Sequence, residues 1–170
     1  MRLLLLRHAE PTLAGRFIGT LDPPLSDRGR AAAADQLASL TVEHVFTSPR
    51  RRARETAEFV PAPCTVVDDL AEIGFGDWEG LTWAEIEARA PDLAAAKLAD
   101  WLSVPTPNGE PFEHLLARVT RALAFLRAQP CSRIAVVGHV VTNAAIHHLL
   151  TGEPPLRFRQ AYLDLRVYEL

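Results

Sequence analysis

The chain has 170 residues, of which 48% are hydrophobic, and it carries 18 Lys and Arg against 21 Asp and Glu, a formal net charge of −3. This length predicts a single domain over residues 1–170 with a sizeable core, and the composition excludes a disordered chain. The slightly acidic balance excludes a general attraction to nucleic acid or to an anionic membrane. Any anion is therefore expected to be bound by arginines that gather locally.

The apolar run Leu3–Leu6 is too short to span a membrane, and it leads into His8 without a small-residue cleavage site. Cys64 and Cys131 lie far apart and lack the spacing of metal ligands, which indicates reduced thiols. We therefore expect a cytoplasmic protein that has neither a membrane nor a nucleic acid as partner.

The same run, Leu3–Leu6, is followed directly by Arg7 and His8. An unbroken apolar run bounded by charge is typical of a strand buried on both faces, as in a parallel sheet flanked by helices. Side chains at the carboxyl end of such a strand stand in the crevice where open α/β folds bind ligands. Arg7 offers a permanent charge there, and the imidazole of His8 can attack, accept or donate a proton.

The next elements alternate between loop, helix and strand. A loop rich in glycine and proline over residues 10–24 begins beside His8 and is expected to form one wall of the crevice. Ser26 is expected to cap a helix over 27–40, and residues 43–48 predict a short strand.

Pro49 favours the start of a helix over residues 50–60, which opens with four arginines in five residues. Helical periodicity prevents these arginines from all pointing one way. Three are expected on a solvated face and one in the crevice.

A third strand over 65–67 precedes residues 70–81, which follow neither the strand nor the helix period. This pattern predicts an ordered irregular segment of the kind that carries function. Two short helices are expected over 82–90 and 93–102, separated by Pro91, with Trp83 and Trp101 interpreted as packing residues. A long amphipathic helix is expected from Phe112 to near residue 128.

Residues 133–139 repeat the opening pattern, an apolar strand that ends in His139. A helix over 140–150 follows, and the N–H groups of its first turn are expected to point at whatever His139 faces. The alternating residues 162–170 predict an edge strand. The elements together indicate an α/β fold, a three-layer α/β/α sandwich whose sheet is mostly parallel with one antiparallel edge strand.

Three predicted strand ends therefore bring Arg7 and His8, Ser48 with a nearby arginine, and His139 to one edge of the sheet. Guanidinium groups, imidazoles and free N–H groups suit a dianionic tetrahedral group such as phosphate. The sequence contains no phosphate-binding glycine loop, dinucleotide fingerprint, zinc-protease motif or cysteine or aspartate phosphatase motif. We expect the positive charge for phosphoryl transfer to come from side chains and backbone, with no metal and no cofactor.

Four segments, in order, resemble the motifs of the histidine phosphatase (phosphoglycerate mutase-like) superfamily. Residues 7–10, Arg-His-Ala-Glu, are similar to its Arg-His-Gly-Glu motif, and residues 48–57 to its Ser-Pro-Leu-x-Arg-Ala-x-x-Thr-Ala segment. Residues 70–80 resemble its Leu-x-Glu-x-x-Phe-Gly-x-Trp-Glu-Gly segment, and residues 136–139 its late histidine strand. The third segment resembles the branch that contains alpha-ribazole phosphatases, broad-specificity phosphatases and fructose-2,6-bisphosphatase domains.

The resemblance implies a role for each of five residues. His8 is the nucleophile that becomes transiently phosphorylated. Arg7 and Arg52 bind the phosphoryl oxygens together with His8, and His139 donates to them as charge grows in the transition state. Glu72 protonates the leaving oxygen and then deprotonates the attacking water.

Three departures from the family pattern bear on the substrate. Ala9 replaces a glycine, which is expected to add a methyl group where the backbone approaches phosphate. The loop after Glu10 is shortened and lacks an asparagine. Val140 and Val141 replace two glycines, which predicts a bulkier and more apolar wall beside the late histidine.

The sequence thus predicts a metal-independent phosphomonoesterase that acts on a small molecule through phosphohistidine, with alpha-ribazole 5'-phosphate as the most specific candidate. A hydrolase is favoured over mutase-like phosphoryl transfer because 170 residues leave little room for the insertions that shield mutases from water. A protein phosphohistidine phosphatase and a phosphate-sensing module without catalysis remain alternatives. The natural substrate and the choice between monomer and homodimer stay open.

Overall fold

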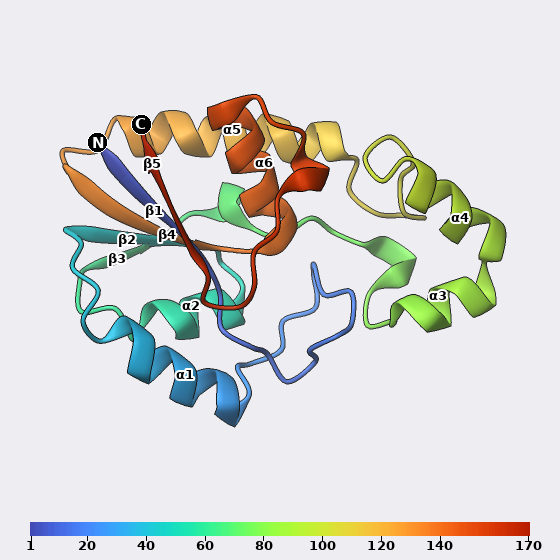
Figure 1. The fold of residues 1–170 in the computed structure, drawn as a ribbon, viewed down its shortest axis with the longest axis horizontal. Helices are drawn as coiled ribbons and strands as arrows, with labels where there is room; N and C mark the ends of the chain where they lie inside the picture. The colour runs from blue at the N-terminus through green and yellow to red at the C-terminus, as the bar shows by residue number, and fades with distance from the viewer.

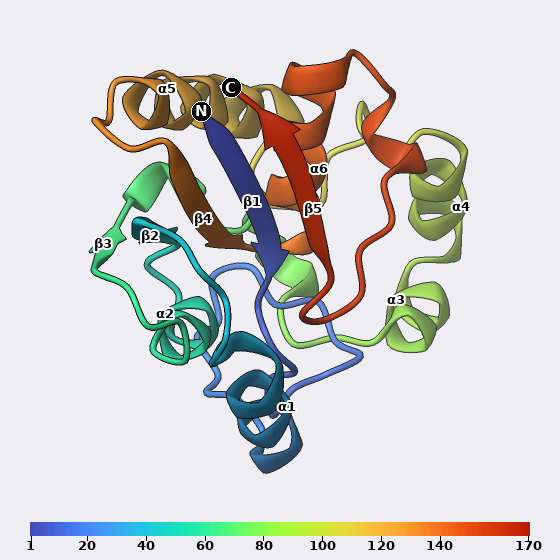
Figure 2. The same ribbon diagram turned by 60° about the vertical axis from the view of Figure 1, so that its left-hand side comes forward.

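The computed structural model describes all residues 1–170 and contains a five-stranded sheet between two layers of helices (Figure 1). The strands are β1 (Arg2–Arg7), β2 (His44–Thr47), β3 (Cys64–Val66), β4 (Arg133–Gly138) and β5 (Leu165–Glu169). They lie in the order β3-β2-β4-β1-β5, in which all neighbours are parallel except β5, which runs antiparallel to β1 (Figure 2). The predicted mostly parallel sheet with one antiparallel edge strand is confirmed.

Successive residues of β1 face opposite helix layers. Leu3 and Leu5 pack with α5 (Phe112–Arg127) and α6 (Val140–Thr151), whereas Leu4 and Leu6 pack with α1 (Asp27–Leu37) and α2 (Arg51–Ala57). Figure 1 shows α5 above the sheet and α1 and α2 below it. The four leucines are all buried, which explains why the run has no polar alternation.

Two further helices extend to one side of the sandwich, at the right of Figure 1. They are α3 (Trp83–Arg89) and α4 (Pro91–Ala99). The expectation that Pro91 separates the two helices was wrong, because Pro91 is the first residue of α4. Proline suits this position, since its missing N–H has no helical acceptor in the first turn.

The other predicted helices and strands are present, with ends shifted by a few residues. Ser26 caps α1 as predicted, but the helix ends at Leu37 rather than at residue 40. The final strand begins at Leu165 rather than at residue 162. Leu163 has a φ of 61°, a left-handed conformation that interrupts the extended chain before β5.

The segment between β3 and α3 is irregular, as predicted, apart from two single-turn 3-10 helices at Asp68–Leu70 and Gly76–Trp78. A third such turn, Pro155–Arg157, follows α6. None of the helices has the length and apolar composition needed to cross a membrane.

The core assignment can be tested with one substitution made at two leucines. Leu126 on α5 is fully buried, whereas Leu149 on α6 is 38% exposed. We expect Leu126→Ala to lower the free energy of unfolding by about 2–5 kcal/mol, because buried methyl groups are lost and a cavity remains. Leu149→Ala should cost less than about 1 kcal/mol. Urea unfolding measures both values, and equal losses would contradict the packing described here.

Candidate active site

The carboxyl ends of β1, β4 and β2 meet at one edge of the sheet because these strands are parallel neighbours. His8 follows β1, Ser48 follows β2 and His139 follows β4. The rings of His8 and His139 have centroids 5.0 Å apart and are tilted by 59°. Both side chains are buried. The fold therefore brings together the two histidines that the sequence analysis singled out.

The imidazole of His8 has a defined tautomer. Its Nδ1 lies 2.7 Å from the carbonyl oxygen of Ala9, and a carbonyl can only accept, so Nδ1 carries the proton of the neutral ring. Burial lowers the pKa of His8 well below 6.5, and the positive charges of Arg52 and Arg7 lower it further. The ring is therefore neutral near pH 7, with the lone pair on Nε2 available as a nucleophile.

The side chain of His139 is held by Ser48, which follows the neighbouring strand β2. Its Nε2 lies 2.7 Å from the hydroxyl of Ser48, which also accepts a hydrogen bond from the Arg50 N–H. Its Nδ1 is buried and has no partner in the protein. Burial lowers the pKa of His139 well below 6.5, with Arg52 again contributing.

Arg7 and Arg52 flank the two histidines, and neither forms an ion pair. Arg52 is fully buried, so among the four arginines at the start of α2 it is the one that turns inward. The Nε atoms of Arg7 and Arg52 are buried without an acceptor, like Nδ1 of His139. A buried charge without a counter-charge is unfavourable, so this group of atoms suits an anion. We call Arg7, His8, Arg52 and His139 the anion site.

The guanidinium of Arg52 is oriented by the loop that follows β1. Its Nη1 donates to the carbonyl oxygen of Leu21 at 3.0 Å, and its Nη2 donates to that of Ile18 at 2.8 Å. The Glu79 carboxylate in turn accepts from the N–H groups of Gly19, Thr20 and Leu21, at distances of 2.8 to 3.2 Å. Glu79 therefore fixes the loop carbonyls that hold Arg52.

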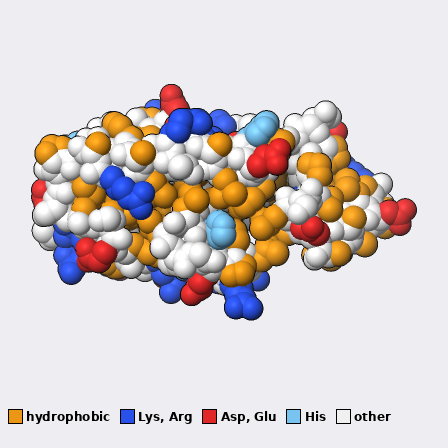
Figure 3. Space-filling view, turned by 90° about the horizontal axis from the view of Figure 1, so that it is seen from above, with side chains coloured by type: hydrophobic (Ala, Val, Ile, Leu, Met, Phe, Trp, Pro, Cys, Tyr) orange, Lys and Arg blue, Asp and Glu red, His pale blue; other side chains and the backbone are white.

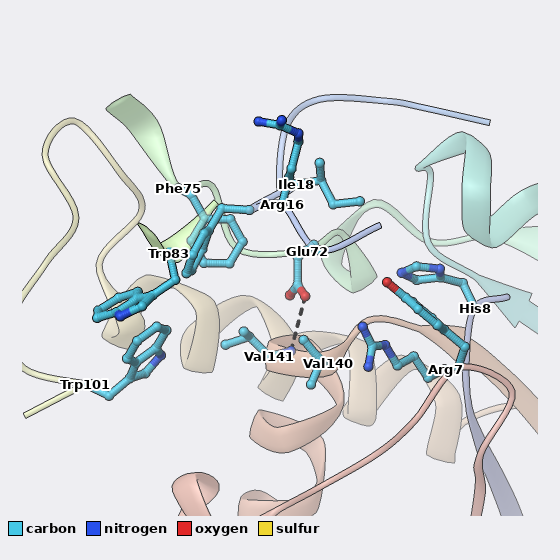
Figure 4. A pocket seen from close by; sticks show the side chains of 13 residues that line it. Arg7, His8, Arg16, Ile18, Glu72, Phe75, Trp83, Trp101, Val140 and Val141 are labelled. Carbon is cyan, nitrogen blue, oxygen red and sulfur yellow. Dashed lines mark hydrogen bonds between the residues drawn. The ribbon is translucent and has the colours of Figure 1, made fainter. Parts of the chain in front are cut away.

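The carboxyl group of Glu72 lies over the start of α6 (Figure 4). One oxygen accepts from the Ile73 N–H and from both the N–H and the hydroxyl of Thr142, each at 3.0 Å. The other accepts from the Val141 N–H at 3.1 Å. The N–H groups in the first turn of α6 were expected to point at whatever His139 faces. This was wrong for the N–H groups of Val141 and Thr142, because both donate to Glu72. The Val140 N–H has no acceptor in the protein.

A cavity of about 280 Å³, called the first cavity, opens beside His8. Figure 4 shows Arg7 and His8 on one side of Glu72, and the rings of Trp83 and Trp101 on the other. Both tryptophans pack near Phe17, as the sequence analysis expected, but both also line the cavity. Residues 15–18 of the loop after β1 line it too, which confirms the predicted wall.

The packing shows where two of the three departures from the family pattern lie. The methyl group of Ala9 is fully buried in the core on the α1 and α2 side and does not line the first cavity. Its expected approach to phosphate stays a prediction. Val140 and Val141 line the cavity and make its wall apolar, as predicted.

Two residues at the site were missed by the sequence analysis. The Tyr162 ring lies beneath the guanidinium of Arg7, whose Cζ is 4.1 Å from the ring centroid, and 5.6 Å from the ring of His8. Tyr162 was assigned to the final strand, and no local motif marks its contact with a residue at the opposite end of the chain. Arg50 was grouped with the solvated arginines, yet its Nε is buried without a partner and its Nη1 donates to the Thr20 carbonyl oxygen.

No group of three or more His, Cys, Asp or Glu side chains is placed to bind a metal ion. The charged groups that surround His8 are instead guanidinium groups, which match the oxygens of a phosphoryl group in geometry and charge.

The sequence model of the Histidine phosphatase superfamily (branch 1) matches residues 3–168. The chain belongs to this superfamily. The adenosylcobalamin/alpha-ribazole phosphatase of Salmonella typhimurium is 32% identical over 162 residues, which cover 89% of this chain and 80% of that protein. A bifunctional protein of Mycobacterium tuberculosis is 38% identical over 150 residues, which cover 82% of this chain but 41% of that protein. This chain thus spans less than half the length of that relative.

The fold agrees with this membership. The crystal structure of the alpha-ribazole phosphatase from Shigella flexneri aligns with a TM-score of 0.87 at 28% identity, and the alignment covers 100% of this chain and 91% of that one. Both sequence and structure therefore show that this chain has the histidine phosphatase architecture.

The buried histidines predict a pH dependence with a definite sign. The pKa values of His8 and His139 both lie well below 6.5 in the folded protein, mainly because of burial. Between those values and 6.5 the unfolded chain binds protons that the folded chain does not, so stability falls as the pH drops below 6.5. NMR of the ring nitrogens in the free protein should show both rings neutral at pH 6.5. Protonation of either ring at or above that pH would contradict the burial argument.

The role of Glu79 can be tested separately. Glu79→Ala leaves the N–H groups of the loop at residues 19–21 without their acceptor, so we expect a loss of about 1–3 kcal/mol in stability. Hydrogen exchange of those N–H groups should become faster. Glu113→Ala, at an exposed position on α5, serves as the matched control and should change neither quantity. Unchanged exchange in the Glu79 variant would show that the carboxylate does not hold the loop.

Proposed function

We propose that the protein hydrolyses a phosphate monoester of a small molecule through a phosphohistidine at His8, without a metal ion. One observation carries this proposal: three buried polar atoms, Nε of Arg7, Nε of Arg52 and Nδ1 of His139, have no hydrogen-bond partner beside an imidazole with a free Nε2 lone pair. A phosphoryl group supplies the oxygens that these atoms lack, in contact with a nucleophile.

In the first step of the proposed reaction, Nε2 of His8 attacks phosphorus and the bond to the leaving oxygen breaks. Glu72 in its acid form gives its proton to that oxygen, so a neutral alcohol departs. Arg7 and Arg52 offset the charge of the dianion, which otherwise repels the attacking lone pair. His139 donates to the phosphoryl oxygens as their charge grows.

In the second step, a water molecule attacks the phosphohistidine. The Glu72 carboxylate accepts the proton of this water, the phosphorus–nitrogen bond breaks, and inorganic phosphate leaves. His8 returns to its neutral form with the proton still on Nδ1, held there by the Ala9 carbonyl oxygen. The hydrogen bonds from Thr142 and Val141 keep the Glu72 carboxyl group in one place for both steps.

For the leaving group, we infer an alcohol that carries an aromatic ring, with alpha-ribazole 5'-phosphate as the most specific candidate. The inference is supported by the names of the Salmonella and Shigella relatives and by Trp83 and Trp101 in the first cavity. A flat aromatic group buries apolar surface against tryptophan rings and can pack on them in a favourable ring geometry. We further propose that residues 1–170 act as one catalytic unit, because every residue given a role lies within the one sheet and its flanking segments.

The chemistry is tested by phosphate release from a panel of phosphomonoesters in the presence of a metal chelator. We expect release to continue under chelation and to be abolished in His8→Ala. Arg52→Lys should lower kcat/KM by about 100-fold or more, since one phosphoryl donor is lost. Arg54→Lys is the matched control, because Arg54 is exposed on the same helix, and it should retain activity. Release that requires a metal, or that persists in His8→Ala, would refute the mechanism.

The covalent intermediate gives an independent test. With radiolabelled 4-nitrophenyl phosphate, whose leaving group needs no proton, rapid quenching should trap a base-stable, acid-labile phosphoenzyme. The phosphoenzyme should accumulate in Glu72→Gln, because attack by water then lacks its base. Label that is absent from wild type and from Glu72→Gln, while turnover continues, would indicate direct attack by water.

A further inference from the structure

A second cavity, of about 390 Å³, lies next to the first. The two cavities share Trp101, Val140 and Val141 in their linings. In Figure 4, Trp101 lies on the side of the first cavity that is farther from His8. The second cavity therefore continues the first in the direction away from the nucleophile.

The lining of the second cavity is almost wholly apolar. Nine of its 11 lining residues are hydrophobic, and most of the lining comes from residues 98–102 at and after the end of α4, from α6 and from the segment at residues 155–158. Arg159 is its one charged residue, and its guanidinium donates to the carbonyl oxygens of Leu156 and Phe158. No carboxylate lines it. An anionic or strongly polar group would gain little there, whereas apolar surface would be removed from water.

The rim of the second cavity exposes apolar side chains to solvent. Leu98 on α4 is 63% exposed, and Leu156 is 45% exposed. Figure 3 shows hydrophobic side chains gathered between the body of the molecule and the lobe that carries α3 and α4. The first cavity alone is slightly smaller than the roughly 300–1,000 Å³ typical of small-molecule sites, and the second cavity more than doubles the space.

We propose that the second cavity binds an apolar tail of the leaving alcohol, so that the substrate is an amphiphilic phosphomonoester. The proposal rests on the function proposed above, because the anion site at His8 fixes the phosphate and therefore the direction in which the alcohol extends. The alcohol passes Glu72 and the rings of the first cavity, and its tail crosses Val141 into the second. Val140 and Val141 form a continuous apolar wall along this path.

The proposal is tested with ethyl, butyl, hexyl and octyl phosphate as substrates. We expect kcat/KM to rise roughly fourfold for each methylene group that enters the second cavity, and to level off once it is filled. Leu156→Asp and Leu98→Asp should flatten this rise without changing kcat/KM for ethyl phosphate. Leu149→Asp is the matched control, because Leu149 is exposed but lines neither cavity, and it should keep the full rise.

A readout that needs no turnover separates this proposal from the catalytic one. In calorimetry, His8→Ala should bind octyl phosphate more tightly than ethyl phosphate. Adding Leu156→Asp to His8→Ala should remove this difference in affinity. Equal affinities and equal kcat/KM values along the series would overturn the proposal. A flat series combined with a dimer that Leu156→Asp dissociates would also overturn it, and would assign the apolar rim to a second copy of the chain. Chain-length-dependent binding without turnover of any ester would support the second cavity and refute the proposed catalysis.

Discussion

The site depends on one buried guanidinium that has no carboxylate partner. Arg52 is fully buried, and two of its nitrogens are satisfied only by the carbonyl oxygens of Ile18 and Leu21. Carbonyl groups orient a charge without neutralising it, so the positive charge of Arg52 remains available to an anion. A carboxylate in their place would neutralise this charge and weaken the attraction for an anion.

The rest of the structure can be understood as support for that arrangement. Glu79 binds the backbone of the loop that presents the two carbonyls, and Gly19 allows the close approach. A Cβ atom at Gly19 would overlap the carbonyl oxygen of Ile73. The motif at residues 70–80 thus supplies two glutamates with different surroundings. Glu72 lines the first cavity, whereas Glu79 acts through the loop on Arg52.

The sequence predicted the features that follow from local residue patterns, but it did not predict side-chain contacts between segments far apart in the chain. The unbroken leucine run predicted a strand buried on both faces. Two apolar strands followed by His8 and His139 predicted that the two histidines lie together, because parallel neighbours end at the same edge of the sheet. Helical periodicity required one arginine of α2 to turn inward, but only the resemblance selected Arg52. Tyr162 could not be predicted, since its contact with Arg7 depends on the turn before β5 and on no local pattern. The binding of Glu72 to the start of α6 was missed for the same reason.

The most direct test of the anion site is a crystal structure of the protein with orthovanadate, which adopts the geometry of phosphoryl transfer. We expect vanadium to bond to Nε2 of His8. Its oxygens should lie within hydrogen-bond distance of Nε of Arg7, Nε of Arg52 and Nδ1 of His139. An oxyanion bound elsewhere, or one at His8 that leaves Nε of Arg52 without an acceptor, would contradict the account.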